Sequence, residues 1–255
     1  MRLKNKTIVI TGGAGGLGNS MATKFLSEGA NVVLSDLDQS VLDAIKAQHS
    51  SERIEVCVAD VTKEPDNQQL IEFAEKTFGG VDIFVANAGT EGIMGPIANQ
   101  ELEAFDRVMA INVRGPFLGI KYAMPAIGRR GGGSIIIVSS IMGLKGGATM
   151  APYVASKHAA IGLMRSAALE GATSGVRVNT INPAPLVGRM MDSIEAGGNA
   201  EPGVDMRAAI ANQMIPLGRY GEFEDMNGLL VLLASDESRF LTGGVYSADG
   251  GASAK

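Results

Sequence analysis

The sequence contains very little cysteine and histidine. Cys57 is its one cysteine, and His49 and His158 are its two histidines. A single thiol cannot form an intramolecular disulfide, and one thiol with two imidazoles is a poor set of metal ligands. The sequence therefore predicts neither a disulfide nor a metal site, as is usual for a protein of a reducing compartment.

Clustered positive charge and long hydrophobic runs are also missing. The chain has 22 Lys and Arg against 27 Asp and Glu, a formal net charge of -5. Nucleic acids and anionic membranes select clustered basic residues, so this balance argues against both as partners. The apolar run at 7–10 is too short for a signal sequence or a membrane span. We therefore expect a soluble, cytoplasmic protein.

Hydrophobic residues and glycine, by contrast, are abundant. Hydrophobic residues make up 45% of the chain, which excludes intrinsic disorder and allows a large core. Glycine accounts for 34 of the 255 residues, about 13% against a usual ~7%. Several glycines directly follow strand-like runs, as Gly12 and Gly13 do, where they permit unusual backbone angles or close approach of a ligand.

Short β-branched runs alternate with longer helical patterns along the whole sequence. The runs predict strands at 7–11, 31–35, 53–58, 81–86, 134–139, 176–181 and 245–247. The patterns predict helices at 17–28, 40–48, 67–78, 102–127, 152–173 and 222–234, with a break near 112–115. Such alternation is typical of βαβ units, and nearly continuous apolar strands are buried on both faces. We therefore predict one α/β domain over 1–255, a Rossmann-like doubly wound parallel sheet of about seven strands with helices on both faces.

A glycine-rich segment, TGGAGGLG at 11–18, follows the first predicted strand and opens the first predicted helix. Glycines at such a junction let backbone amides approach a pyrophosphate, which the helix N-terminus stabilises through its dipole. Taken alone, the segment could be a turn that binds nothing, but its place between strand and helix favours a dinucleotide site. We assign Gly12, Gly16, Leu17 and Gly18 to cofactor binding.

Asp36 ends the second predicted strand, 18 residues after Gly18. A carboxylate at this place accepts hydrogen bonds from an adenosine ribose. Alone, Asp36 would be interpreted as the cap of the helix near residue 40, but with the glycine loop it indicates ribose binding. The carboxylate repels a 2′-phosphate, and the residues that follow, beginning with Leu37, include no Lys or Arg before position 40. We therefore predict NAD rather than NADP.

Two further polar turns follow the third and fourth predicted strands. They contain Asp60 and Val61, and Asn87, Ala88 and Gly89. The carboxyl ends of strands form the ligand-binding edge of an open α/β sheet. Asp and Asn-x-Gly are also ordinary turn residues, so these segments say little by themselves. We include all five residues in the predicted cofactor site.

Ser140, Tyr153 and Lys157 are the strongest chemical signal. Tyr153 and Lys157 are four residues apart, which places them on one helix face, and Ser140 follows the fifth predicted strand. A nearby cation favours the phenolate and lowers a tyrosine pKa from ~10, which makes the phenol a usable proton carrier. Alone, Tyr-x-x-x-Lys is typical of a solvated helix face. Its occurrence after a dinucleotide loop and Asp36 favours catalysis.

With these motifs the sequence resembles the compact branch of the short-chain dehydrogenase/reductase family over nearly its whole length. TGxxxGxG at 11–18 is similar to the cofactor loop of that family, and NAG at 87–89 and DGG at 249–251 are similar to two of its other motifs. The resemblance implies a catalytic tetrad of Asn112, Ser140, Tyr153 and Lys157, of which the last two also contact the cofactor. It further implies an NAD(P)(H)-linked alcohol dehydrogenase or ketone reductase that assembles as a homotetramer.

The sequence departs from the family pattern after the sixth predicted strand. The Pro-Gly pair of the family is Pro183-Ala184 here, and the threonine usual five residues after that proline is Gly188. The resemblance places Pro183, Ala184 and Leu186 against the nicotinamide half of the cofactor, where a side-chain contact to the carboxamide is then missing. We expect Gly188→Thr to restore that contact and tighten NADH binding.

The segment 183–216 is rich in Met, Gly and Pro and has weak helical patterning. Segments of this kind over an α/β sheet often form mobile lids, so we expect it to order over bound substrate. Methionine stripes occur in cores as well as in pockets, and both interpretations stay open. The predicted substrate pocket is apolar and consists of Met142, Leu144, Met150, Met190 and Met191.

These observations predict an NAD-dependent oxidoreductase that transfers a hydride between nicotinamide and a compact hydrophobic secondary alcohol or ketone, cyclic or aryl-bearing. A 3-oxoacyl-type or other carbonyl reductase of the same family is the alternative. A catalytically silent NAD-binding protein is disfavoured because the tetrad is complete. A nucleotide-sugar epimerase or dehydratase is disfavoured because few residues follow the motif at 249–251.

Overall fold

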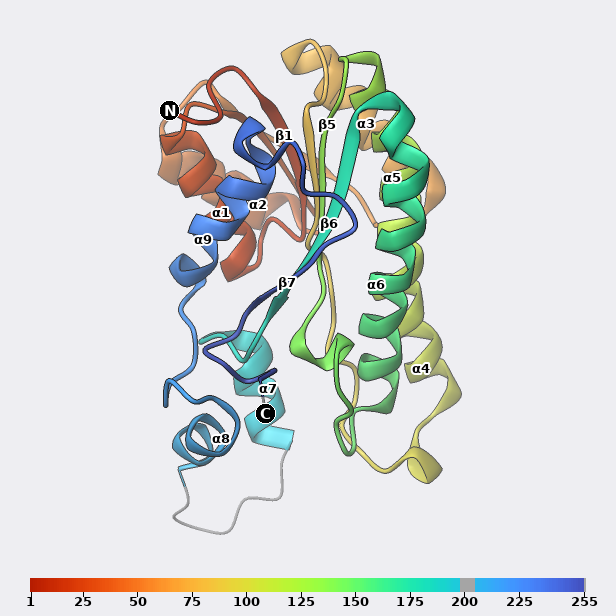
Figure 1. The fold of residues 1–255 in the computed structure, drawn as a ribbon, viewed down its shortest axis with the longest axis vertical. Coiled ribbons are helices and arrows are strands. Elements are labelled where there is room, and N and C mark those ends of the chain that lie inside the picture. Colours follow the sequence, from red (N-terminus) through yellow and green to blue (C-terminus); the bar gives the residue numbers. More distant parts are fainter. Residues whose placement is uncertain (198–204, 255) are drawn as a thin grey trace.

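The computed structural model describes residues 1–197 and 205–254, and within them the chain forms a seven-stranded parallel sheet (Figure 1). The strand order is β3-β2-β1-β4-β5-β6-β7. The strands are β1 (Thr7–Thr11), β2 (Asn31–Asp36), β3 (Ile54–Val58), β4 (Ile83–Ala86), β5 (Gly133–Val138), β6 (Val176–Pro183) and β7 (Val245–Ala248). The order reverses between β1 and β4, which is where open α/β sheets bind ligands. The predicted fold class is confirmed.

Helices cover both faces of this sheet (Figure 1). One layer consists of α1 (Gly16–Ser27), α2 (Gln39–His49) and α9 (Phe223–Ala234). The other layer consists of α3 (Glu64–Phe78), α5 (Gly115–Arg129) and α6 (Ala151–Gly171), with α4 (Leu102–Met109) leading into α5. The described part of the chain contains no helix that could cross a membrane.

The two layers explain why the central strands are apolar throughout. Ile8 and Ile10 of β1 are buried in the core beneath α1, α2 and α9. Val9, which lies between them in sequence, is buried on the opposite face with Phe84 of β4. Because alternate side chains point to opposite faces of a strand, a sheet covered on both sides buries every position.

The segment 102–127 contains two α-helices, α4 and α5, as predicted, and the predicted break between them is a helical distortion and not an interruption of the helix. Between α4 and α5 the backbone widens into a π-helical turn at Ala110–Arg114. The Asn112 amide explains the distortion: its Oδ1 accepts from Thr90 N (2.9 Å) and its Nδ2 donates to Thr90 O (2.8 Å). These bonds pull the helix toward the loop after β4 without ending it, as π-bulges commonly do at functional sites.

The segment 183–216, predicted to have little regular structure, contains two helices, α7 (Arg189–Gly197) and α8 (Met206–Met214). Arg207 of α8 donates from Nη2 to Asp192 Oδ1 (2.7 Å) and from Nε to Glu195 Oε1 (3.4 Å), both on α7. The two helices are therefore held together by charge pairs. Residues 198–204 of the predicted lid lie outside the described residues.

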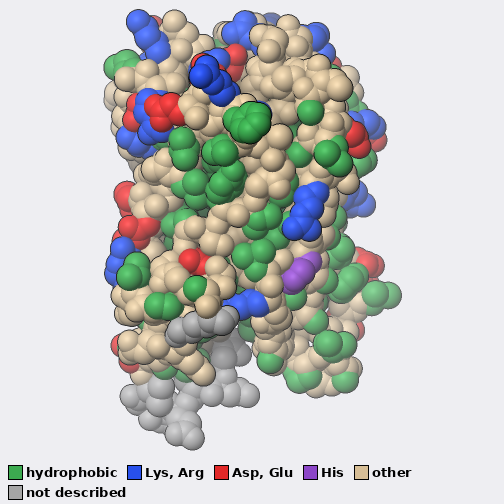
Figure 2. Space-filling model, in the orientation of Figure 1, with side chains coloured by type: hydrophobic (Ala, Val, Ile, Leu, Met, Phe, Trp, Pro, Cys, Tyr) green, Lys and Arg blue, Asp and Glu red, His purple; other side chains and the backbone are tan. Residues whose placement is uncertain are grey.

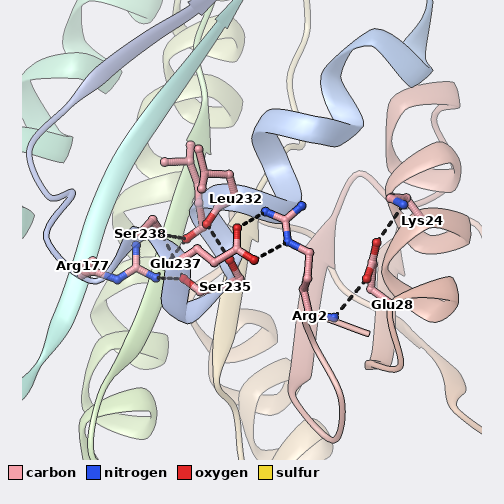
Figure 3. Close-up of polar contacts among 9 residues, drawn as sticks. Arg2, Lys24, Glu28, Arg177, Leu232, Ser235, Glu237 and Ser238 are labelled. Carbon is pink, nitrogen blue, oxygen red and sulfur yellow. Dashed lines mark hydrogen bonds and ion pairs between the residues drawn. The ribbon is translucent and has the colours of Figure 1, made fainter.

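The N-terminal segment fastens the far ends of α1 and α9 (Figure 3). Arg2 donates from its guanidinium to both carboxylate oxygens of Glu237 (3.0 and 2.7 Å), just beyond α9. Its backbone N–H donates to Glu28 (3.0 Å), which also pairs with Lys24 of α1 (2.8 Å). These contacts anchor the two helices whose other ends, at Gly16 and Phe223, lie at the functional site described below.

Candidate active site

A cavity of about 970 Å³ opens at the carboxyl ends of the strands, near the upper limit of ~1,000 Å³ usual for ligand sites. Most residues predicted for the cofactor, the catalytic groups and the substrate line it. These residues are Gly12, Gly16, Leu17, Gly18, Asp36, Leu37, Asp60, Val61, Asn87, Ala88, Gly89, Ser140, Met142, Met150, Tyr153, Lys157, Pro183, Ala184, Leu186, Met190 and Met191. Asn112 and Leu144, although both lie in the described part of the chain, are not among the lining residues.

The glycine loop forms a cradle that side chains could not occupy. Gly12 has a φ of +67°, and a Cβ there would lie 2.8 Å from Ala88 Cα. A Cβ at Gly18 would lie 2.4 Å from the Gly12 carbonyl oxygen. Gly15, the N-cap of α1, supplies no side-chain hydrogen bond, so the first amides of that helix have no capping side chain. The loop therefore offers donors and a favourable dipole to an anionic group such as a pyrophosphate.

Asp36 is directed at this loop and not at the following helix. Its Oδ2 accepts from Ala14 N (2.9 Å) and its Oδ1 from Leu37 N (2.8 Å). The cap of α2 is Asp38, whose Oδ1 accepts from Ser40 N (2.8 Å). The alternative interpretation of Asp36 as a helix cap is thus excluded.

Asn87 braces the loop from the neighbouring strand. Its Nδ2 donates to the carbonyl oxygens of Thr11 and Gly12, both at 3.0 Å. The Thr11 hydroxyl in turn accepts from the N–H groups of Asn87 (3.1 Å) and Ala88 (3.2 Å). The Asn87 amide is therefore occupied within the protein and holds the cradle in shape.

Ser140, Tyr153 and Lys157 converge on the cavity and are all buried. Lys157 Nζ donates to the Val138 carbonyl (2.9 Å) and lies 5.5 Å from the centroid of the Tyr153 ring. Asn182 of β6 donates to the Ser140 carbonyl (2.9 Å), which fixes the turn that carries the serine. The strand ends and one face of α6 thus place a hydroxyl, a phenol and an ammonium at one point.

The pKa of Tyr153 is not lowered, contrary to the expectation from its spacing to Lys157. Burial raises it to about 12; a hydrogen bond with Ser140 lowers it and the charge of Glu91 raises it further. Burial also lowers the pKa of Lys157 to about 8. Desolvation dominates because both groups are enclosed.

Asn112 and Leu144 lie near the site but do not line the cavity. Asn112 Nδ2 also donates to Ser156 Oγ (3.0 Å), which donates to the Tyr153 carbonyl (2.7 Å). Asn112 therefore supports the backbone of α6 beneath Tyr153. Leu144 follows a 3₁₀ turn at Ile141–Gly143 and is 40% exposed, so its assignment to the substrate pocket stays a prediction.

Gly188 does not leave room for the missing threonine. Its φ is +146°, a conformation that side chains rarely adopt, and a Cβ there would lie 2.8 Å from Phe223 Cζ. The expectation that Gly188→Thr restores a contact is therefore wrong, because the threonine would be strained and would collide with the ring.

Two of the lining residues, Ile210 and Phe223, were not predicted from the sequence. Ile194 of α7, Ile210 and Met214 of α8, and Phe223 of α9 all face the cavity. The i,i+4 spacing of Ile210 and Met214 was an available signal. Phe223 had no such signal, because its partners are distant in sequence.

Glu91 and Arg189 form an ion pair beside the cavity. Glu91 is 7% exposed, and its Oε1 accepts from Arg189 Nη1 at 3.2 Å. Its Oε2 has no hydrogen-bond partner among the described residues. The pair joins the loop after β4 to the start of α7, with its buried carboxylate close enough to Tyr153 to act on the phenol.

A doubly wound sheet with a glycine cradle, an acid at the end of β2 and a Ser-Tyr-Lys group beside them defines a dinucleotide-binding α/β protein. A family model described as enoyl-(acyl carrier protein) reductase matches residues 12–253. The chain belongs to the short-chain dehydrogenase/reductase family, whose dehydrogenases use a nicotinamide cofactor, and it is an oxidoreductase.

Individual relatives match over nearly the whole chain. It is 38% identical to 2-(S)-hydroxypropyl-CoM dehydrogenase 3 of Xanthobacter autotrophicus, over 99% of this chain and 98% of the relative. It is 36% identical to (+)-borneol dehydrogenase 2 of Salvia officinalis, over 98% and 90% of the two chains. A crystal structure of levodione reductase matches with a TM-score of 0.94 at 31% identity, covering 99% of each chain.

Replacing Glu91 by Gln should shift the pH dependence of alcohol oxidation to lower pH. The Glu91 charge raises the pKa of Tyr153, so the neutral amide lowers that pKa and the phenolate forms at lower pH. Turnover against pH for wild type and Glu91→Gln measures this shift. The matched control is Glu103→Gln on the exposed surface of α4, which should leave the profile in place. An unmoved Glu91→Gln profile, or a shift to higher pH, would contradict this assignment.

Proposed function

We propose that the protein is an NAD-dependent dehydrogenase of compact hydrophobic secondary alcohols, cyclic or aryl-bearing, which also reduces the corresponding ketones. The observation that carries the proposal is the single cavity shared by the glycine cradle, Asp36 and the Ser140-Tyr153-Lys157 group. The activities named for two relatives, (+)-borneol dehydrogenase 2 and levodione reductase, agree with a cyclic substrate.

The described residues fit a nicotinamide dinucleotide. The cradle that a Cβ at Gly12 or Gly18 would fill suits a pyrophosphate, and Asp36 suits an adenosine ribose. We assign the remaining cofactor contacts to residues at the strand ends and on α6: Leu37, Asp60, Val61, Asn87, Ala88, Gly89, Tyr153, Lys157, Pro183, Ala184 and Leu186. When bound, the nicotinamide supplies a hydride acceptor or donor at its C4 position.

The protein's own groups handle the proton and hold the substrate. In oxidation Tyr153 accepts the alcohol proton, and in reduction it donates a proton to the carbonyl oxygen, while Ser140 hydrogen-bonds that oxygen. Lys157 carries positive charge beside the phenol and contacts the cofactor ribose. With a pKa of about 12, Tyr153 is protonated at neutral pH, which favours ketone reduction there and alcohol oxidation at alkaline pH.

The substrate side of the cavity is apolar. Met142 and Met150 come from the region before α6, and α7 and α8 contribute further apolar side chains: Met190, Met191, Ile194, Ile210 and Met214. Such a wall favours an apolar substrate, and the flexible thioethers allow it to adapt to different shapes. We propose that the segment 183–216 acts as the lid of this compartment.

One alternative is a 3-oxoacyl-type or other carbonyl reductase of the same family; the description of the matching family model, enoyl-(acyl carrier protein) reductase, also names a carrier-bound acyl substrate. A panel of cyclic and aryl secondary alcohols with NAD, run beside 3-oxoacyl thioesters with NADH, separates the two functions. Our proposal predicts NADH formation with the alcohols. Activity confined to thioesters, polyols or carboxylates would contradict it.

A homotetramer is part of the proposal. Hydrophobic side chains gather over the middle of the face in Figure 2, and charged ones lie mostly along its upper end and sides. Among the apolar side chains of the described surface, Phe240 is 98% exposed and Leu169 is 80% exposed. Edge strand β7 and such exposed apolar groups favour association with further copies of the chain. A monomeric mass in light scattering would contradict this assembly.

Tyr153→Phe should reduce turnover by at least ~10²-fold while leaving NADH binding intact, because it removes only the proton carrier. Steady-state kinetics and fluorescence titration with NADH measure the two effects. Tyr122→Phe removes a hydroxyl that donates to Glu64 outside the cavity, and it should behave as wild type. Near-normal turnover in Tyr153→Phe would refute the assigned role.

Asp36 should make kcat/KM with NAD exceed that with NADP by more than tenfold, a difference above ~1.4 kcal/mol. The carboxylate repels a 2′-phosphate, so Asp36→Ala combined with Leu37→Arg should narrow or reverse the preference. Asp43→Ala, on the exposed surface of α2, is the matched control and should preserve it. Equal efficiency of the wild type with both cofactors would overturn the assignment.

A further inference from the structure

Phe223 is held firmly at the rim of the cavity. It is the first residue of α9, and a capping box between Glu222 and Asp225 fixes the start of that helix. Arg219 clamps Asp225 with two hydrogen bonds, of 2.7 and 3.2 Å. The ring lines the cavity, and the helix cap fixes the backbone from which the ring projects.

The ring occupies the space of two absent side chains. A Cβ at Gly16 would lie 2.2 Å from Phe223 Cε2 and 2.6 Å from Cζ, and a Cβ at Gly188 would lie 2.8 Å from Cζ. Gly188 needs glycine for its backbone as well, since its φ is +146°. Gly16 is different because it lies in ordinary helical backbone at the start of α1. The aromatic ring is therefore what excludes a side chain at Gly16.

The same ring joins two parts of the site that are separate in sequence. Gly16 belongs to the cradle, whereas Gly188 immediately precedes α7. A short parallel bridge pairs the segment before Gly188 with the segment before Phe223: Val187 N donates to Gly221 O (2.9 Å) and Gly221 N donates to Pro185 O (3.0 Å). Phe223 follows that bridge by two residues, so the cradle, the start of α7 and the ring form one packed unit.

We propose that Phe223 is a cofactor-positioning residue, whose ring walls the cavity between the cradle and the start of α7 and takes the place of the side chain missing at Gly188. The inference rests on the proposed NAD-binding function. It predicts that the ring acts on the nicotinamide half of the cofactor. The AMP half, which we assign to Asp36 and its contact with Ala14, should be insensitive to the ring.

Two ligands separate these parts. Dissociation constants are measured for NADH by fluorescence and for AMP by calorimetry, with wild type, Phe223→Leu and Phe223→Ala. Phe223→Ala should weaken NADH binding by roughly tenfold, which corresponds to ~1.4 kcal/mol, and Phe223→Leu by less. AMP binding should stay within about twofold of wild type, a change of about 0.4 kcal/mol in binding free energy against ~1.4 kcal/mol for NADH. Phe117→Ala, half exposed on α5 and outside the cavity lining, is the matched control and should change neither constant.

The outcomes distinguish this inference from the function on which it rests. A wild-type protein that binds AMP but not NADH would contradict the proposed function itself. If wild type binds NADH, unchanged NADH binding in Phe223→Ala would overturn the inference alone. An equal loss of NADH and AMP binding would overturn it too, because that result marks a general structural defect.

A second variant pair tests the contact directly. Gly16→Ala should impair NADH binding because its methyl group meets the ring, and adding Phe223→Ala should recover part of that loss by vacating the space. Thermal denaturation identifies variants that are folded. If Gly16→Ala is equally harmful with and without the ring, the ring does not set the position of the cradle and the inference fails.

Discussion

The close approach of two backbones at the point where the strand order reverses is the constraint on which the site depends. Gly12, at the end of β1, passes so near Ala88 that a Cβ would lie 2.8 Å from its Cα. Thr11 and Asn87 close the gap with reciprocal hydrogen bonds, of 3.0 to 3.2 Å. This junction sets where α1 begins and hence where its N-terminal amides point. The contact of Asp36 with Ala14 and that of Phe223 with Gly16 both depend on that placement.

The burial of the catalytic side chains then determines their protonation. Burial acts on Tyr153 and Lys157 in opposite senses, raising the phenol pKa to about 12 and lowering the ammonium pKa to about 8. Both changes favour the neutral forms, as expected where water is excluded. The nearby carboxylate of Glu91 strengthens the effect on Tyr153 and also reaches Arg189 at the start of α7. The proton chemistry and the α7 side of the cavity are therefore linked through one buried acid.

Local patterns in the sequence were sufficient for the framework but not for its long-range contacts. The strands could be predicted because β1 and β4 bury both faces, and the cradle because its glycines are consecutive with β1. The place of the helix break near Asn112 could be predicted, but its π-helical form could not, since Asn112 bonds to Thr90, 22 residues earlier. The spacing of Tyr153 and Lys157 showed their proximity but not their desolvation. Gly188 lacks a side chain because of its φ of +146° and because of Phe223, which is remote in sequence, and neither reason is visible in the sequence.

The central claim is that this cavity is a hydride-transfer site, and isotope tracing tests it most directly. Compact cyclic secondary alcohols carrying deuterium at the carbinol carbon are oxidised with unlabelled NAD, and the NADH formed is examined by NMR. The account predicts that the deuterium is found at nicotinamide C4. Reduced cofactor without the label, with the deuterium lost to solvent, would contradict direct transfer between the substrate and the cofactor.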